Sequence, residues 1–463
     1  MDGFGRPPVR GAASLEWSSM EKVDTLIKAR WVAPVVPAGE LRVDHAVAIR
    51  QGRIVDVLPG EDALERYDPA ETVERPGHLL IPGLVNAHTH AAMTLLRGLA
   101  DDRPLMEWLQ KHIWPAEQRW MSAEFVEHGS ELAMAEMLLG GTTTFNDMYF
   151  FPEVVARAAP RCGVRACVGM ILIKYPTVGA GDSGEYLRKG LALRDEYKGH
   201  PLISTAFAPH APYTVDDEDL VKIRRLADEL EVPVHTHVHE TADEVLGSVV
   251  DCGDRPLARL DRLGLVSPLL MAVHMTQLDD TEIARLAAAG ASVVHCPESN
   301  LKLASGFCPV ATLLAAGVNV CLGTDGAASN NDLDMLGEMR TAALLAKAVA
   351  GRADALTAEQ ALAMATINGA RALGLADQIG SIEPGKWADL CCVDLERPAT
   401  WPVYDPVAQL VYAACRDQVE DVWVAGRRMV ADGRLSRMDD AAIVARAGAW
   451  RDRIAGDGER DHA

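Results

Sequence analysis

Eight short β-rich runs, each followed by a helix-like segment, are the feature that most limits the folds open to this chain. Such alternation is typical of parallel strands joined by crossover helices. Eight units in roughly 300 residues predict a (β/α)₈ barrel of the TIM type, and a doubly wound open sheet is the alternative. The predicted strands are 80–90, 142–148, 165–173, 203–210, 232–240, 269–275, 291–297 and 318–325. Helical periodicity predicts helices over 217–230, 280–289 and 333–350.

The two flanks of the barrel segment 81–384 differ from it in pattern. Residues 23–80 and 385–438 contain alternating, hairpin-like strands, with a turn at Gln51-Gly52 as one example. We therefore expect both chain ends to build one composite β-sandwich domain. Residues 1–22 are expected to form a disordered extension that lacks the apolar centre of a secretory signal, and residues 439–463 a C-terminal helix and tail.

Charge and cysteine usage limit the partners and the compartment. The chain has 45 Lys and Arg against 66 Asp and Glu, so its formal net charge is −21. That balance argues against a nucleic-acid or anionic-membrane partner and is compatible with a small neutral or cationic substrate. Nine scattered cysteines without a CxxC pair predict reduced core thiols in a cytoplasmic protein. The sequence contains no run of 18 apolar residues, so we predict no membrane-spanning segment.

Histidines and one aspartate stand where predicted strands end. His88 and His90 are two positions apart, so both point to the same face of a strand. His237 ends the fifth strand, His274 the sixth and Asp325 the eighth. The carboxyl ends of barrel strands meet at one mouth, and nitrogen ligands with a carboxylate suit Zn²⁺, although iron and manganese stay open.

Two further histidines in the "HTHVHE" run need not be ligands. His235 and His239 are interpreted as packing residues or as hydrogen-bonding partners of the ligands. A burial cost applies to Asp325, because a carboxylate after an apolar strand needs a metal or another partner.

Four motifs carry a resemblance to a known family. They are "PGLVNAHTHAAMTLLRGLADD" (82–102), "HVHET" (237–241), "VHMTQL" (273–278) and "GTDGAASNNDLDM" (323–335). In this order and at strand ends, they resemble the amidohydrolase superfamily, and within it the 5′-methylthioadenosine/S-adenosylhomocysteine deaminases and their chlorohydrolase relatives. The resemblance implies a zinc-dependent hydrolytic deaminase of adenosine-type nucleosides, with a homo-oligomer as the expected assembly. Alternatives are an enzyme acting on a free base of the guanine or cytosine type or on a triazine, and a non-catalytic barrel scaffold.

The resemblance also implies a role for each site residue. One zinc ion per subunit is expected, and its ligands would be His88, His90, His237 and Asp325. The implied catalytic residues are Glu240, His274 and Asp325, and the implied substrate-binding residues are Trp108, Glu117, His210 and Glu240. Plainer interpretations remain: a helix N-terminal carboxylate for Glu240, a solvated helix residue for Glu117 and core packing for Trp108.

Two positions refine what the resemblance implies. Binuclear members of the superfamily carry a lysine at the end of strand four, but this chain has Ala208-Pro209-His210 there, which favours one metal. Members that act on S-adenosylhomocysteine are expected to carry arginines after strand three. Lys174 and Arg188 are the nearby candidates here, and neither aligns, so 5′-methylthioadenosine is the favoured substrate.

Overall fold

The structure, a computed structural model, describes residues 20–458. Most of the expected disordered extension, together with residues 459–463 of the expected tail, lies outside the described residues. The predicted boundary at residue 22 is wrong by two positions, because strand β1 (Glu21–Val32) begins at Glu21. Glu21 and Lys22 already pair in register with Tyr67 and Asp68 of the parallel strand β4 (Tyr67–Pro82).

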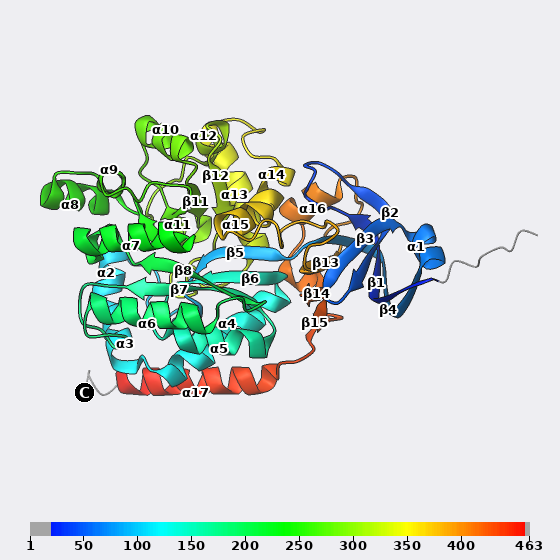
Figure 1. Cartoon of the computed structure of the whole chain (residues 1–463), viewed down its shortest axis with the longest axis horizontal. Coiled ribbons are helices and arrows are strands. Elements are labelled where there is room, and N and C mark those ends of the chain that lie inside the picture. The colour runs from blue at the N-terminus through cyan, green and yellow to red at the C-terminus, as the bar shows by residue number, and fades with distance from the viewer. Residues whose placement is uncertain (1–19, 459–463) are drawn as a thin grey trace, which may run out of the picture.

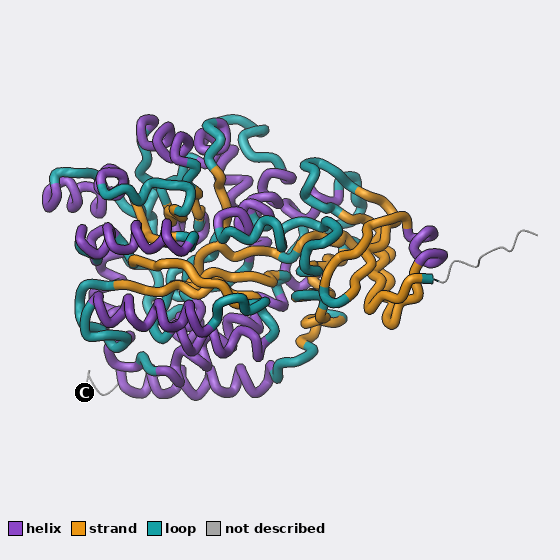
Figure 2. The backbone as a smooth tube through the Cα atoms, viewed as in Figure 1, coloured by secondary structure: helices purple, strands orange, loops and turns teal. Residues whose placement is uncertain are grey.

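Eight parallel strands form a barrel at the centre of the molecule (Figures 1 and 2). Each of the eight predicted runs contains one of them. They are β5 (Leu84–Thr89), β6 (Thr142–Asp147), β7 (Arg165–Leu172), β8 (Ile203–Pro209), β9 (Val234–Val238), β10 (Leu270–His274), β11 (Ser292–His295) and β12 (Asn319–Leu322).

The last strand of the barrel returns to the first, which excludes the doubly wound alternative. The Asp325 amide, just after β12, donates to the His88 carbonyl of β5 at 3.0 Å. The Thr324 amide donates to the Asn86 side chain at 3.0 Å, and the Asn86 amide donates back to the Thr324 hydroxyl at 2.7 Å. These contacts join the last strand of the barrel to the first, so the sheet closes on itself.

Helices surround the barrel, and the predicted ones are found. Helices α7 (Asp217–Leu230) and α10 (Asp280–Ala289) have the predicted bounds, and α13 (Met335–Ala350) begins two residues late. The others up to the barrel's end are η1 (Ala91–Leu96), α2 (Leu105–Trp108), η2 (Leu109–Ile113), α3 (Trp114–Trp120), α4 (Ala123–Leu139), α5 (Pro152–Cys162), α6 (Ser183–Glu196), η3 (Pro212–Thr214), α8 (Ala242–Cys252), α9 (Pro256–Arg262), α11 (Pro297–Lys302), α12 (Val310–Ala315), α14 (Ala358–Met364) and α15 (Ile367–Ala372).

Both chain ends build a second, mixed sheet, as expected. Its strand order is β16-β15-β14-β13-β4-β1-β2-β3, so N-terminal and C-terminal strands lie side by side (Figure 1). Its remaining elements are β2 (Arg42–Arg50), β3 (Arg53–Pro59), α1 (Gly60–Arg66), β13 (Leu390–Asp394), β14 (Val419–Val424), β15 (Arg427–Ala431) and β16 (Arg434–Leu435). Arg53 of edge strand β3 also bridges Trp387, so the sheet curls around an apolar core.

One helix inside the predicted β segment 385–438 belongs with the barrel helices instead. Helix α16 (Pro406–Tyr412) packs beside α14 and α13, and Arg340 of α13 donates to the Val411 carbonyl at 3.2 Å. The short 3-10 turn η4 (Arg416–Gln418) then leads back to β14. The apolar positions Val407, Leu410 and Val411 are buried there, which a strand pattern alone does not reveal.

The predicted C-terminal helix is α17 (Asp440–Gly458), which lies along the barrel's flank (red in Figure 1). Trp450 donates from Nε1 to His128 of α4 at 3.1 Å, and its ring meets Phe125 edge-on. Arg446 pairs with Glu131 at 2.7 Å. Within residues 20–458, no helix combines the length and the apolar character that crossing a membrane requires.

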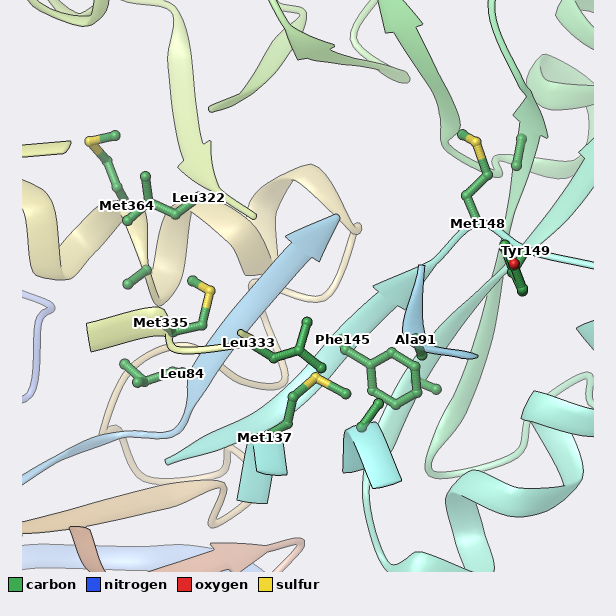
Figure 3. Close-up of a cluster of buried hydrophobic side chains, with 14 of the residues drawn as sticks. Leu84, Ala91, Met137, Phe145, Met148, Tyr149, Leu322, Leu333, Met335 and Met364 are labelled. Atoms are coloured by element: carbon green, nitrogen blue, oxygen red, sulfur yellow. The ribbon is translucent and has the colours of Figure 1, made fainter. Parts of the chain in front are cut away.

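A buried apolar cluster packs barrel strands β5, β6 and β12 against helix α13 (Figure 3). Figure 3 shows Leu84 of β5, Phe145 of β6, Leu322 of β12 and Met335 of α13 packed with their neighbours. All four side chains are fully buried. Because these strands and α13 share one core, the side chains at the strands' carboxyl ends have fixed relative positions.

Candidate metal centre

Three imidazoles and one carboxylate meet at the carboxyl ends of β5, β9 and β12. The Nε2 atoms of His88 and His90 each lie 3.3 Å from Asp325 Oδ1. The Nε2 atoms of His88 and His237 lie 3.3 Å apart, and ligand atoms of His88, His90 and His237 all lie within 4.8 Å of one another. Ligand atoms of His88, His274 and Asp325 also lie within 4.8 Å of one another, so His88 belongs to both groups at this mouth of the barrel.

The three imidazoles are oriented from their opposite ring nitrogens. His90 Nδ1 donates to the Met148 carbonyl at 2.5 Å, and His237 Nδ1 donates to the His210 carbonyl at 2.8 Å. His88 Nδ1 instead lies 2.8 Å from Nε2 of His235. In each case Nε2 is left to face the shared centre, as in histidine–metal sites whose outer partners fix the ring.

Asp325 is held by hydroxyl groups from helix α11 and from the turn after β12. Its Oδ2 accepts from the hydroxyls of Ser299 at 2.6 Å and Ser329 at 2.8 Å, and its Oδ1 accepts from the Gly326 amide at 2.7 Å. Burial alone would raise the pKa of Asp325, but its hydrogen bonds with the facing histidines hold that pKa well below the ordinary value. The side chain of Asp325 is therefore anionic at neutral pH.

Comparisons with known proteins agree with this geometry. The model of the amidohydrolase family matches residues 79–429. The chain is 51% identical over 432 residues to a protein of Teredinibacter turnerae named 5-methylthioadenosine/S-adenosylhomocysteine deaminase, a match that covers 93% of this chain and 98% of that protein.

The chain belongs to the amidohydrolase family.

Two more matches extend the likeness. A Saccharophagus degradans protein with the same name is 50% identical, and that match covers 93% of this chain and 97% of the relative. Among solved structures, an adenosine deaminase from Xanthomonas campestris with bound zinc is 57% identical with a TM-score of 0.94. That match covers 95% of this chain and 100% of the solved one.

Two ionisable side chains of this amidohydrolase, Glu240 and His274, lie beside the candidate ligands. Glu240 follows β9, and His274 ends β10; Glu240 Oε2 lies 3.7 Å from His274 Nε2. Burial raises the pKa of Glu240, which favours its protonated form. His274 Nδ1 donates to the Asn300 side-chain oxygen at 2.9 Å, so Nε2 points toward Glu240 and the centre.

Three of the predicted substrate-binding residues have different surroundings in the structure. The His210 ring, at the end of β8, lies 4.9 Å from the His237 ring, and its Nδ1 lies 3.0 Å from the Thr214 hydroxyl. Glu117 of α3 accepts from the Tyr149 hydroxyl at 2.7 Å, and burial raises the pKa of Glu117 to about 7. Trp108 is buried within the main apolar core, a position that its packing alone can explain.

Several residues around the centre have no counterpart among the predicted site residues. Ser299 and Asn300 lie in "CPESN" after the seventh strand, a motif without a predicted role. Ser329 lies in a polar turn after β12, and its hydroxyl also contacts Asp325. Tyr149 follows β6, where the polar run "TTTFNDMY" at a strand end is a signal that could have indicated it.

Proposed function

We propose that this amidohydrolase is a zinc-dependent deaminase of adenosine-type nucleosides that converts 5′-methylthioadenosine to its inosine analogue and ammonia. The observation that carries the proposal is the convergence of His88, His90, His237 and Asp325 beside Glu240. The names of the closely similar relatives support the same substrate class, and the zinc in the similar adenosine deaminase structure supports the metal.

The donor set fits a divalent metal. Three imidazole nitrogens with a carboxylate oxygen suit Zn²⁺, and their outer nitrogens are already hydrogen-bonded, so little rearrangement is needed. At the end of β8 the chain has Ala208 and Pro209 rather than a bridging lysine, which supports one ion per subunit. When bound, the ion lowers the pKa of a water ligand to about 7, so that hydroxide is available at neutral pH.

Three side chains are placed to move protons during deamination. The carbon that bears the amino group accepts a nucleophile only when the neighbouring ring nitrogen is protonated. Glu240 is the proposed general acid for that nitrogen, and its raised pKa keeps a proton available. Asp325 takes one proton from the attacking water and gives it to the amino group, which leaves as ammonia, while the second water proton is released as the carbonyl forms and restores the proton on Glu240. His274 stabilises the new oxygen as negative charge develops on it.

Glu117 and His210 are the proposed substrate contacts, whereas Trp108 is packed in the main apolar core and its substrate contact stays a prediction from the family resemblance. As a carboxylate, Glu117 can accept hydrogen bonds from the two ribose hydroxyls, and Tyr149 holds it in place. The His210 ring lies against the His237 ring, where we propose that it contacts the base of the nucleoside. Fixing the nucleoside in this way turns an encounter into a reactive geometry.

The 5′ substituent favoured by the proposal is the small methylthio group. Lys174, one of two basic candidates after β7, has its ammonium 3.2 Å from Asp216. The other, Arg188 of α6, is exposed on that helix. Neither supplies a clear partner for the amino-acid carboxylate of S-adenosylhomocysteine, so we propose that 5′-methylthioadenosine is the better substrate.

Ammonia release across a panel of substrates is the experiment that tests the function. The panel contains 5′-methylthioadenosine, S-adenosylhomocysteine, adenosine, guanine and cytosine, and chloride release from a chlorotriazine is measured in parallel. Turnover of the adenosine nucleosides alone supports the proposal. Turnover of only a free base or a triazine, or no turnover by zinc-loaded protein, would overturn it.

The cysteines bear on the proposed cell compartment. All nine cysteines have free thiols, and seven of them are buried, which supports a reducing, cytoplasmic setting but corrects the expectation that all nine lie in the core. Cys252 and Cys415 are exposed. A homo-oligomer stays a prediction from the family resemblance.

A further inference from the structure

His88 and His235 form a hydrogen bond between two fully buried imidazoles. His88 Nδ1 and His235 Nε2 are 2.8 Å apart, although the residues are separated by 147 positions in the sequence. Neither side chain is exposed, and the two rings are inclined by 72°. His235 lies two residues before the proposed ligand His237 on β9, so it occupies the layer just below the centre.

This contact differs from those of the other two histidine ligands. His90 and His237 are oriented by backbone carbonyls, whereas the partner of His88 is a side chain. A carbonyl partner persists whatever side chain its residue carries. Among the three proposed histidine ligands, only His88 therefore has an orientation that depends on which side chain its partner residue carries.

We propose that His235 is a positioning residue for the metal centre, which keeps the proton of His88 on Nδ1 and thereby turns the Nε2 lone pair toward the ion. The proposal rests on the metal centre proposed above. A neutral imidazole carries one proton; if Nε2 binds a metal, that proton is on Nδ1. His88 must then be the donor and His235 Nε2 the acceptor, so the single proton of His235 is on its own Nδ1.

The surroundings of His235 argue against a role in packing alone. Its Nδ1 is buried without a hydrogen-bond partner among residues 20–458. An unsatisfied buried N–H destabilises the folded state, so an apolar side chain of similar size would be favoured unless the bond to His88 offsets that cost. The same β9 layer faces apolar residues such as Met271 and Val273 of β10, which could pack around such a replacement.

An imidazole acceptor also has a chemical consequence that a carboxylate would not have. Many metal-bound histidines donate to a carboxylate, which adds negative charge and makes the ligand more basic. His235 orients the ring without adding a charge, so the ligand set of His88, His90, His237 and Asp325 keeps the single negative charge of the aspartate. The ion then retains more of its positive charge for activating water.

Zinc affinity in chelator competition tests the proposal. His235→Gln keeps an acceptor oxygen near the Nε2 position, whereas His235→Leu removes it at similar size. We expect His235→Leu to lower zinc affinity by about 10- to 100-fold and His235→Gln to retain most of it. The matched control is His295→Leu, because His295 of β11 is equally buried and makes no hydrogen bond with the four ligands in the described chain. Its affinity should equal that of the wild type.

The outcomes separate this proposal from the metal centre itself. Equal zinc affinity of folded His235→Leu and wild-type protein would overturn the positioning role. If His235→Leu does not fold, ¹⁵N NMR of histidine-labelled wild-type protein, assigned with His235→Gln, reports the tautomer of His235; a proton on Nε2 would also overturn it. Wild-type protein that binds no stoichiometric metal would overturn the metal centre, and this inference with it.

Discussion

His274 Nε2 lies 3.7 Å from Glu240 Oε2, and each side chain comes from the carboxyl end of a neighbouring barrel strand. Each of the two residues also has a hydrogen-bond partner outside the pair. Asn300 contacts His274 Nδ1 at 2.9 Å, and Glu244 accepts from the Glu240 amide at 2.6 Å. The two groups lie next to the four proposed ligands, and the proposed acid, Glu240, can be tested by a single substitution.

Glu240→Gln should retain the metal and lose most of the turnover. The amide has nearly the shape of the carboxylic acid but cannot transfer a proton to the ring nitrogen, so we expect kcat to fall by about 10²- to 10⁴-fold. Ammonia release measures turnover, and elemental analysis measures the metal. A kcat near that of the wild type would remove the acid role from Glu240.

His88→Ala should lower the amount of bound zinc. The substitution removes one of four donors and also leaves His235 without its partner at 2.8 Å. We expect zinc content after dialysis to fall well below that of the wild type, with a loss of affinity of at least about tenfold. Treating the wild type with a chelator should abolish ammonia release, and added zinc should restore it. Full zinc occupancy in His88→Ala would contradict its assignment as a ligand.

Glu117→Ala should affect nucleosides that carry ribose hydroxyls more than analogues that lack them. Hydrogen bonds to a charged group contribute about 1.5–3 kcal/mol, so kcat/KM for 5′-methylthioadenosine should fall by roughly 10- to 100-fold. The control substrate is 2′,3′-dideoxyadenosine, on which the variant and the wild type should differ little. Tyr149→Phe should show the same discrimination to a smaller degree, because the carboxylate keeps its charge but loses its 2.7 Å partner. Equal losses on both substrates would exclude the ribose contact.

The pKa of Glu117 predicts a pH dependence of substrate binding. Burial raises this pKa from 4.5 to about 7, so below pH 7 the side chain is mostly a neutral acid and above it a carboxylate. The carboxylate is the better acceptor for ribose hydroxyls; KM for 5′-methylthioadenosine should therefore decrease as the pH rises from about 6 to 8. Glu117→Gln should lose this dependence. A KM that rises with pH in the wild type would contradict the assignment.

Asp389→Ala should destabilise the protein without removing the metal. Asp389, just before β13, accepts from Arg165 of β7 at 2.8 and 3.2 Å, and both side chains are buried where the β domain meets the barrel. Removing one member leaves a buried charge unpaired, which costs about 3–5 kcal/mol.

The matched control for that variant is an exposed ion pair. Glu74→Ala breaks the contact between Lys28 and Glu74, where the Glu74 side chain is 65% exposed, so the free energy of unfolding should change by less than about 1 kcal/mol. Denaturant unfolding measures both variants. Equal stability of Asp389→Ala and the wild type would show that the Arg165 pair contributes no net stability.

Local periodicity is enough to predict the barrel and the gathering of strand-end histidines and Asp325 at one mouth, whereas the choice of ligands among them came from the family resemblance. Alternation of strand and helix is written in neighbouring residues, and the carboxyl ends of parallel strands necessarily meet at one face. His88, His90, His237 and Asp325 can therefore be placed together from the amino-acid sequence alone. The bounds of α7 and α10 are predictable for a similar reason, because capping residues and helical periodicity are also local.

Contacts between distant segments were decided only by the tertiary structure. The bonds from Ser299 and Ser329 to Asp325, from Tyr149 to Glu117 and between His88 and His235 depend on how the barrel closes and how its loops fold over the mouth. The place of α16 against the barrel helices is of the same kind. Such contacts leave no periodic trace in the sequence, because serine, tyrosine or histidine at these positions would suit a turn or a core equally well until the facing side chain is known.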